Sequence, residues 1–131
     1  MRFLALLLAS HVFAGHGLSV TAPVSWHVVG HRLTVCTDPA QRLAVAGPRG
    51  QLVVVLERLA NPARRGPRRP RPFKLEARPQ FIECCAPRRT RGWFFAWVER
   101  GRELYAYAYT GGGSRGDVAR VLDSLAVAAR R

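Results

Sequence analysis

The sequence is short of lysine, of acidic residues and of cysteine, and it contains no long uninterrupted apolar run. Its 131 residues include eight acidic residues, three cysteines and a single lysine, Lys74. A transmembrane helix needs about 20 consecutive apolar residues, so we expect no transmembrane span. Three cysteines are too few for the framework of several disulfides that stabilises very small secreted domains. An apolar core must therefore supply most of the stability.

Arginine supplies nearly all of the positive charge. It accounts for 20 of the 21 basic residues, and the formal net charge is +13. Alanine, glycine and proline are also abundant, as in proteins from GC-rich genomes, so we favour a compositional origin for this charge. The alternative is a polyanion-binding protein that binds nucleic acid or an anionic surface. Its binding residues would form two arginine runs: Arg64, Arg65, Arg68, Arg69 and Arg71, then Arg88, Arg89 and Arg91.

The length and the 48% apolar composition fit one globular domain, but the N-terminal residues have a different character. Arg2 precedes an apolar run, and Val12 and Ala14 occupy positions suited to signal peptidase. We therefore predict a signal peptide at 1–16, a single α+β domain at 17–131, and a secreted or extracytoplasmic location. The alternatives are a buried N-terminal helix and a misplaced start codon.

The cysteines are Cys36, Cys84 and Cys85. Export favours a disulfide between Cys36 and one of the adjacent pair, formed across neighbouring strands. Two alternatives remain open, namely reduced core cysteines and a vicinal bridge between Cys84 and Cys85. Neighbours on a strand face opposite sides, which makes the vicinal bridge the least favoured.

Most of the domain has the alternating or β-branched pattern of strands. The ranges are 17–23, 26–36 with a bend at Gly30, 43–46, 51–57, 73–85 with interruptions, and the hairpin 93–98 and 104–109. The run 51–57 is apolar on both faces, so it should be a central strand. Ser114 with Asp117 predicts the start of a helix that lies across the sheet, followed by a short strand at 126–129.

Residues 61–72 contain four prolines and five arginines with almost nothing apolar. This composition predicts an exposed, polyproline-like loop that adds nothing to the core.

The sequence contains few residue patterns that indicate a binding, metal or catalytic site. Tyr105, Tyr107 and Tyr109 share one face of a strand, and a partly exposed row of this kind is our candidate ligand-contact surface. His27 and His31 lie near Cys36, but no second ligand pair supports a structural zinc site, so we predict neither metal nor cofactor. No nucleophile elbow and no acid–base pair of carboxylates is recognisable, so we predict no catalytic residues and a protein that is not an enzyme.

The beginning and end of the domain resemble one family. Gly17 to Trp26 reads as a strand, a proline and a tryptophan, and Val121 to Val127 closes a helix that follows an aromatic strand and a glycine break. Both features resemble PsbP-like proteins. The chain is also similar to small secreted proteins of GC-rich bacteria, which share the Leu-Asp-Ser-Leu ending and a Glu-Cys pair, here Glu83-Cys84.

The resemblance implies an antiparallel sheet with flanking helices that serves as a non-catalytic accessory or binding module. The connection Gly47–Gly50 departs from the family, because a longer, helix-bearing segment would be expected there. The sequence therefore predicts an α+β fold, an antiparallel β-sheet with one C-terminal α-helix packed across it. It also predicts an exported binding or accessory domain of unknown ligand, for which an extracytoplasmic protein and a polyanion are the candidate partners.

Overall fold

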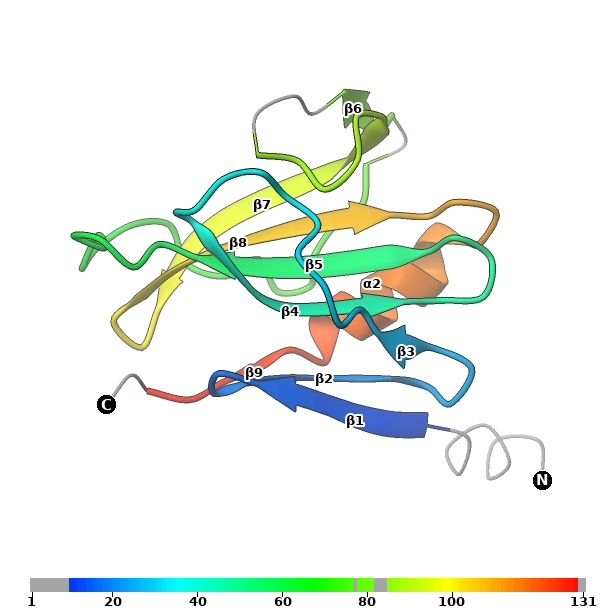
Figure 1. Cartoon of the computed structure of the whole chain (residues 1–131), viewed down its shortest axis with the longest axis horizontal. Coiled ribbons are helices and arrows are strands. Elements are labelled where there is room, and N and C mark those ends of the chain that lie inside the picture. Colours follow the sequence, from blue (N-terminus) through cyan, green and yellow to red (C-terminus); the bar gives the residue numbers. More distant parts are fainter. Residues whose placement is uncertain (1–9, 77, 82–84, 130–131) are drawn as a thin grey trace.

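The computed structural model describes residues 10–76, 78–81 and 85–129, which form two antiparallel sheets and one helix (Figure 1). This confirms the predicted α+β fold with a C-terminal helix. The elements are β1 (Ser10–Gly15), β2 (Leu18–Pro23), β3 (His27–Val28), β4 (Ala40–Ala46), β5 (Leu52–Glu57), β6 (Gln80–Phe81), β7 (Arg91–Glu99), β8 (Arg102–Tyr109), α2 (Arg115–Asp123) and β9 (Ala126–Val127).

The larger sheet has the order β3-β4-β5-β8-β7-β6, and the smaller one has the order β1-β2-β9. Helix α2 packs against β2 and β5, so the helix and the smaller sheet both lie on one face of the larger sheet (Figure 1). Every residue of β5 is buried. This confirms the expectation of a central strand with two covered faces.

Each face of the larger sheet has its own apolar cluster. The first lies between the sheet, α2 and the smaller sheet, and includes Trp97, Leu104 and Val121. The second lies on the opposite face, where irregular segments supply Val29, Leu33 and Ala86. A disulfide between Cys36 and Cys85 joins the segments that provide this second cover, with 5.5 Å between the two Cα atoms.

The disulfide confirms the expected pairing of Cys36 with one of the two adjacent cysteines and shows that this cysteine is Cys85. The expected location was wrong, because the bridge links two irregular segments and not neighbouring strands. Cys84 and Glu83 lie outside the described residues, as do residues 1–9 of the predicted signal peptide.

Local sequence signals account for the hairpin and the helix. The β7–β8 turn consists of Arg100 and Gly101, whose φ angles of 51° and 74° are typical of a tight two-residue hairpin turn. At the start of α2, the Ser114 hydroxyl accepts a hydrogen bond from the Asp117 amide at 3.1 Å, as a helix N-cap requires. Both elements were predicted.

Two predicted strands are much shorter than expected. His27–Val28 is the only strand within 26–36, and Gln80–Phe81 is the only strand among the residues of 73–85 that the structure describes, which are 73–76, 78–81 and 85. In the first segment a side chain replaces the expected strand partner, because Gln41 accepts from the Leu33 amide at 2.8 Å and donates to the His31 carbonyl at 2.9 Å. Val35, assigned to a strand from its pattern, is 96% exposed.

One strand was not expected. β1, which lies within the predicted signal peptide, pairs with all six residues of β2. A cut after Ala14 would remove all but Gly15 of β1, so such processing and the full β1–β2 pairing exclude one another. Among the described residues, no helix has the length and apolar character needed to span a membrane.

Candidate functional site

The arginine-rich segment 61–72, here called the arginine loop, is fixed to the end of the β7–β8 hairpin. The Ala63 amide donates to the Glu103 carboxylate at 2.7 Å, and the Pro67 carbonyl accepts from the Val98 amide at 2.8 Å. Close contact with Val98 also leaves no room for a side chain at Gly66, where a Cβ would lie 2.8 Å from a Val98 methyl group. The loop is therefore packed at several points along its length.

Arg69 turns inward and is the main anchor of the arginine loop. Its guanidinium binds both carboxylate oxygens of Glu99 at 2.7 Å and also donates to the Leu125 carbonyl. Burial alone would raise the pKa of Glu99, but hydrogen bonds from Arg69 and Trp97 lower it below its usual range. The side chain of Arg69 is only 6% exposed, so the expectation of a wholly exposed loop is wrong at this residue.

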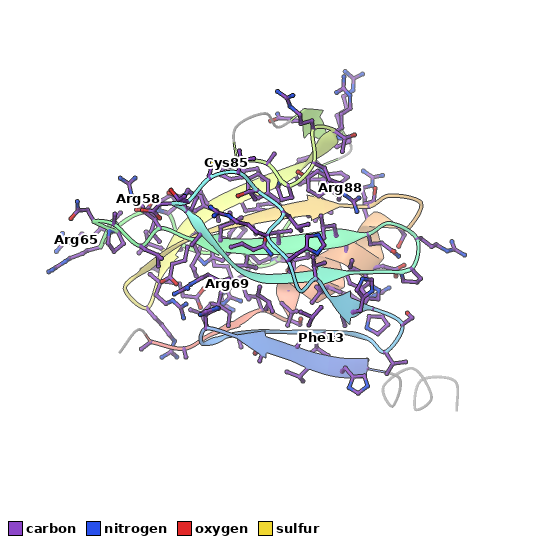
Figure 2. The ribbon with its side chains drawn as sticks, viewed as in Figure 1. Phe13, Arg58, Arg65, Arg69, Cys85 and Arg88 are labelled. Atoms are coloured by element: carbon purple, nitrogen blue, oxygen red, sulfur yellow. A yellow bond between two sulfur atoms is a disulfide. The ribbon has the colours of Figure 1, made fainter. Side chains whose placement is uncertain are left out.

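The remaining arginines of the loop point outward. Arg71 is exposed and reaches Glu99 only at 3.9 Å. Arg64, Arg65 and Arg68 are exposed and have no ion-pair partner among the residues that the structure describes. Figure 2 shows Arg65 at the tip of the loop, pointing away from the sheets. An anion could thus contact three guanidinium groups without breaking an existing ion pair.

The second arginine run lies at the opposite end of the larger sheet. Arg88 donates to the Gly50 carbonyl at 2.7 Å and lies over the ring of Tyr109, 5.6 Å from its centre. Tyr109 pairs with Leu52 at the start of β5, whereas the arginine loop binds Glu99 beside the β7–β8 turn. Arg89 and Arg91 are exposed. The two predicted runs therefore do not form one site (Figure 2).

The tyrosine row is mostly covered. Tyr107 and Tyr109 are 4% and 1% exposed and belong to the second apolar cluster, while Tyr105 is partly exposed and donates from its hydroxyl to Glu103. Burial raises the pKa of Tyr109, which donates to the Arg88 carbonyl at 3.2 Å. The predicted row does share one face, but a ligand reaching this surface would meet only Tyr105 of the three.

The sequence matches no family model, and comparison with the curated proteins and with the solved structures finds no match.

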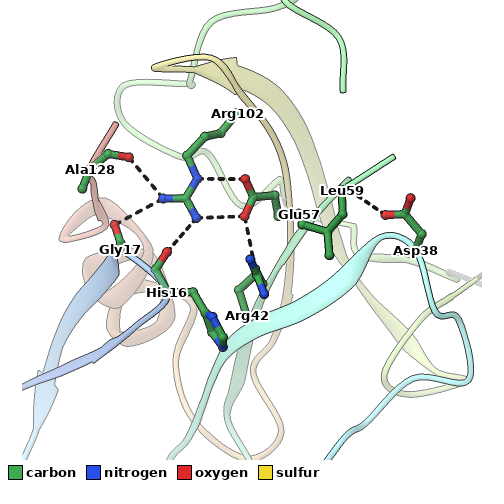
Figure 3. Close-up of polar contacts among 8 residues, drawn as sticks. All are labelled: His16, Gly17, Asp38, Arg42, Glu57, Leu59, Arg102 and Ala128. Carbon is green, nitrogen blue, oxygen red and sulfur yellow. Dashed lines mark hydrogen bonds and ion pairs between the residues drawn. The ribbon is translucent and has the colours of Figure 1, made fainter. Parts of the chain in front are cut away.

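A buried ion pair lies between the two sheets (Figure 3). Arg102 donates to both oxygens of Glu57 at 2.9 and 2.8 Å, and Arg42 binds the same carboxylate at 3.2 Å. Burial raises the pKa of Glu57, but the hydrogen bonds from Arg102 and Arg42 outweigh it, so the pKa lies below its usual range. A carboxylate held ionised in this way is suited to structure and not to proton transfer.

Arg102 also connects the sheets through backbone groups. It donates to the carbonyls of His16 at 2.7 Å and Ala128 at 3.1 Å, which flank β2 and β9 respectively (Figure 3). These groups line a pocket of about 370 Å³. Because all five N–H groups of the Arg102 guanidinium are already used, Arg102 has no donor left for a ligand in this pocket.

The candidate metal ligands are not brought together. Cys36 is oxidised in the disulfide, and His27 and His31 lie on β3 and in the segment after it. Among the described residues, no group of three His, Cys, Asp or Glu side chains is arranged to hold a metal ion.

Sequence reasoning missed the inward role of Arg69, the clamp formed by Arg102, and the β7 edge described below. The sequence did contain one indication of the two arginine partners. Glu57 and Glu99 both end apolar strands, and a buried carboxylate at such a position needs a cationic partner.

Proposed function

We propose that the protein is an exported, non-enzymatic binding domain that holds an anionic partner with the arginine loop. The proposal is supported mainly by the different orientations of the arginines within the loop. Arg69 fixes the loop to Glu99, while Arg64, Arg65 and Arg68 project from it with no acidic partner among the described residues. Holding cations on an anchored loop lowers the conformational entropy lost on binding.

Two further features support the proposal. The disulfide between Cys36 and Cys85 suits an oxidising compartment, as expected for export. The two carboxylates that contact the loop, Glu99 and Glu103, have lowered pKa values because they accept hydrogen bonds. These carboxylates are occupied in holding the loop, so the exposed side chains of Arg64, Arg65 and Arg68 stay available to an anionic partner.

The test uses the full chain and two triple variants that lose the same charge. In the loop variant, Arg64, Arg65 and Arg68 become Gln. In the control variant, the changed arginines are exposed ones outside the loop with no side-chain partner in the described structure: Arg32, Arg49 and Arg89.

We expect the loop variant to elute from immobilised heparin at clearly lower salt than the control variant, because three direct charge contacts are lost. Equal elution of the two variants would mean that net charge, and not the loop, determines binding, and would overturn the proposal.

A further inference from the structure

Within the described residues, the outer edge of β7 is hydrogen-bonded at both of its ends and unpaired in the middle. At one end β6 pairs with Gly92 and Arg91. At the other end the Pro67 carbonyl of the arginine loop accepts from the Val98 amide at 2.8 Å. Phe94 and Ala96 lie between these two covers, and both are exposed.

The hairpin turn fixes which backbone groups of β7 face this edge. Glu99 pairs with Arg102 directly across the two-residue turn, so this pair exchanges hydrogen bonds within the hairpin. Backbone groups alternate along a strand, which directs the N–H and C=O groups of Val98, Ala96 and Phe94 away from β8. The bond from Val98 to Pro67 agrees with this assignment.

The backbone groups of Phe94 and Ala96 on this edge have no hydrogen-bond partner among the described residues. Each residue offers one N–H and one C=O, which is the pattern that an added β-strand pairs with.

The side chains around this open stretch are aromatic and basic. Phe94 is 46% exposed, and its ring stacks on Tyr105 with 5.9 Å between the ring centres. A groove of about 220 Å³ lies beside Phe94 and Phe95. Its lining includes two basic residues, Lys74 and Arg78, and one acidic residue, Glu76. The arginine loop adjoins the other end of the stretch through Pro67, so positive charge flanks the open backbone on both sides.

We propose that the partner is a protein whose extended, acidic segment adds as a strand to the edge of β7. Its backbone would pair with Phe94 and Ala96, and its carboxylates would contact the exposed arginines of the loop at one end and Lys74 and Arg78 at the other. This inference rests on the proposed function and names its partner class. Regularly spaced peptide groups favour a polypeptide over nucleic acid, because nucleic acid lacks the alternating N–H and C=O groups that a strand edge pairs with.

The test compares two synthetic peptides of equal charge. One is an N-acetylated, C-amidated repeat of four Glu-Val units, and the other replaces every valine with proline, which removes the alternate N–H donors and disfavours strand pairing. We expect the Glu-Val peptide to bind the full-length protein at least about tenfold more tightly, since several backbone hydrogen bonds distinguish the two. Equal affinities would overturn the inference.

A variant of the protein tests the same edge. Ala96→Pro removes an N–H that faces outward, a position where an edge strand tolerates proline, and Ala96→Val is the matched control. We expect Ala96→Pro to bind the Glu-Val peptide about tenfold more weakly than Ala96→Val, and both to bind heparin equally. Equal peptide binding by the two variants would contradict strand addition.

Hydrogen exchange provides a readout that needs no variant. Adding the Glu-Val peptide to the unaltered protein should slow amide exchange at Phe94 and Ala96 at least about tenfold, because exchange-competent edge amides become hydrogen-bonded. Unchanged exchange at both amides during saturated binding would overturn the inference. The arginine-loop variant separates the two proposals, because its loss of heparin binding upholds the proposed function whatever happens at the edge.

Discussion

Arg102 binds both carboxylate oxygens of Glu57 while its remaining donors reach the carbonyls of His16, Gly17 and Ala128. Arg102 is 3% exposed and Glu57 is fully buried. A single guanidinium thus connects β5 of the larger sheet with the turn before β2 and the end of β9.

Replacing one member of this pair should destabilise the protein strongly. We expect Glu57→Gln to lower the free energy of unfolding by about 3 kcal/mol, because Arg102 then keeps a buried charge without its counter-ion. Chemical denaturation measures the change. Arg120→Gln is the matched control, since its ion pair with Asp117 lies on the surface of α2 and should contribute less than about 0.5 kcal/mol. Equal losses in the two variants would contradict the clamp.

The buried carboxylates of Glu57 and Glu99 should make the stability of the protein depend on pH. The pKa values of Glu57 and Glu99 are lowered in the folded chain, so the unfolded state binds more protons below the ordinary glutamate pKa of about 4.3. The stability contributed by these groups is present above that pH and is lost as the pH falls through their folded pKa values. Denaturation midpoints between neutral pH and pH 3 should fall less steeply in a Glu99→Gln variant than in the unaltered protein.

Reduction of the disulfide should destabilise the protein without changing the helix. Cys36 and Cys85 are 49 residues apart, and a closed loop of that length restricts the unfolded chain by about 4 kcal/mol in the chain-entropy treatment. We expect a comparable loss of unfolding free energy after reduction and alkylation. Because the bridge joins only the segments over the second apolar cluster, amides of α2 should keep their relative protection in hydrogen exchange. Preferential loss of protection in α2 would be the contrary result.

Helix α2 offers a small and local test. Ser114→Ala removes the acceptor for the Asp117 amide, and loss of such an N-cap costs about 1 kcal/mol. Thermal denaturation should show the loss, and Ser114→Asp should restore most of it because a carboxylate also accepts this bond. A Ser114→Asp variant as unstable as Ser114→Ala would argue against the cap.

Elements that depend on neighbouring residues were predictable from the sequence. The N-cap needs only Ser114 and the Asp117 amide, and the hairpin needs only alternating aromatics and a two-residue turn at Arg100 and Gly101. The all-apolar run of β5 likewise indicated its central place before its partners were known.

Features that depend on distant partners could not be predicted. The segment after β3 follows Gln41 instead of a strand partner, and the Asp38 carboxylate holds the amides of Leu59 and Ala60. Nothing in the sequence 61–72 distinguishes Arg69 from its neighbours, because its inward direction depends on Glu99, thirty residues away. The open stretch of β7 likewise depends on where β6 and Pro67 happen to stop covering it.

The residues that anchor the arginine loop are different from the residues that it exposes. Pro67 and Arg69 hold the loop in place through Val98 and Glu99, whereas the side chains of Arg64, Arg65 and Arg68 support nothing else in the described structure. These three positions can therefore be exchanged for other residues while the scaffold stays intact. The loop is a natural site for grafting new binding specificities onto this fold.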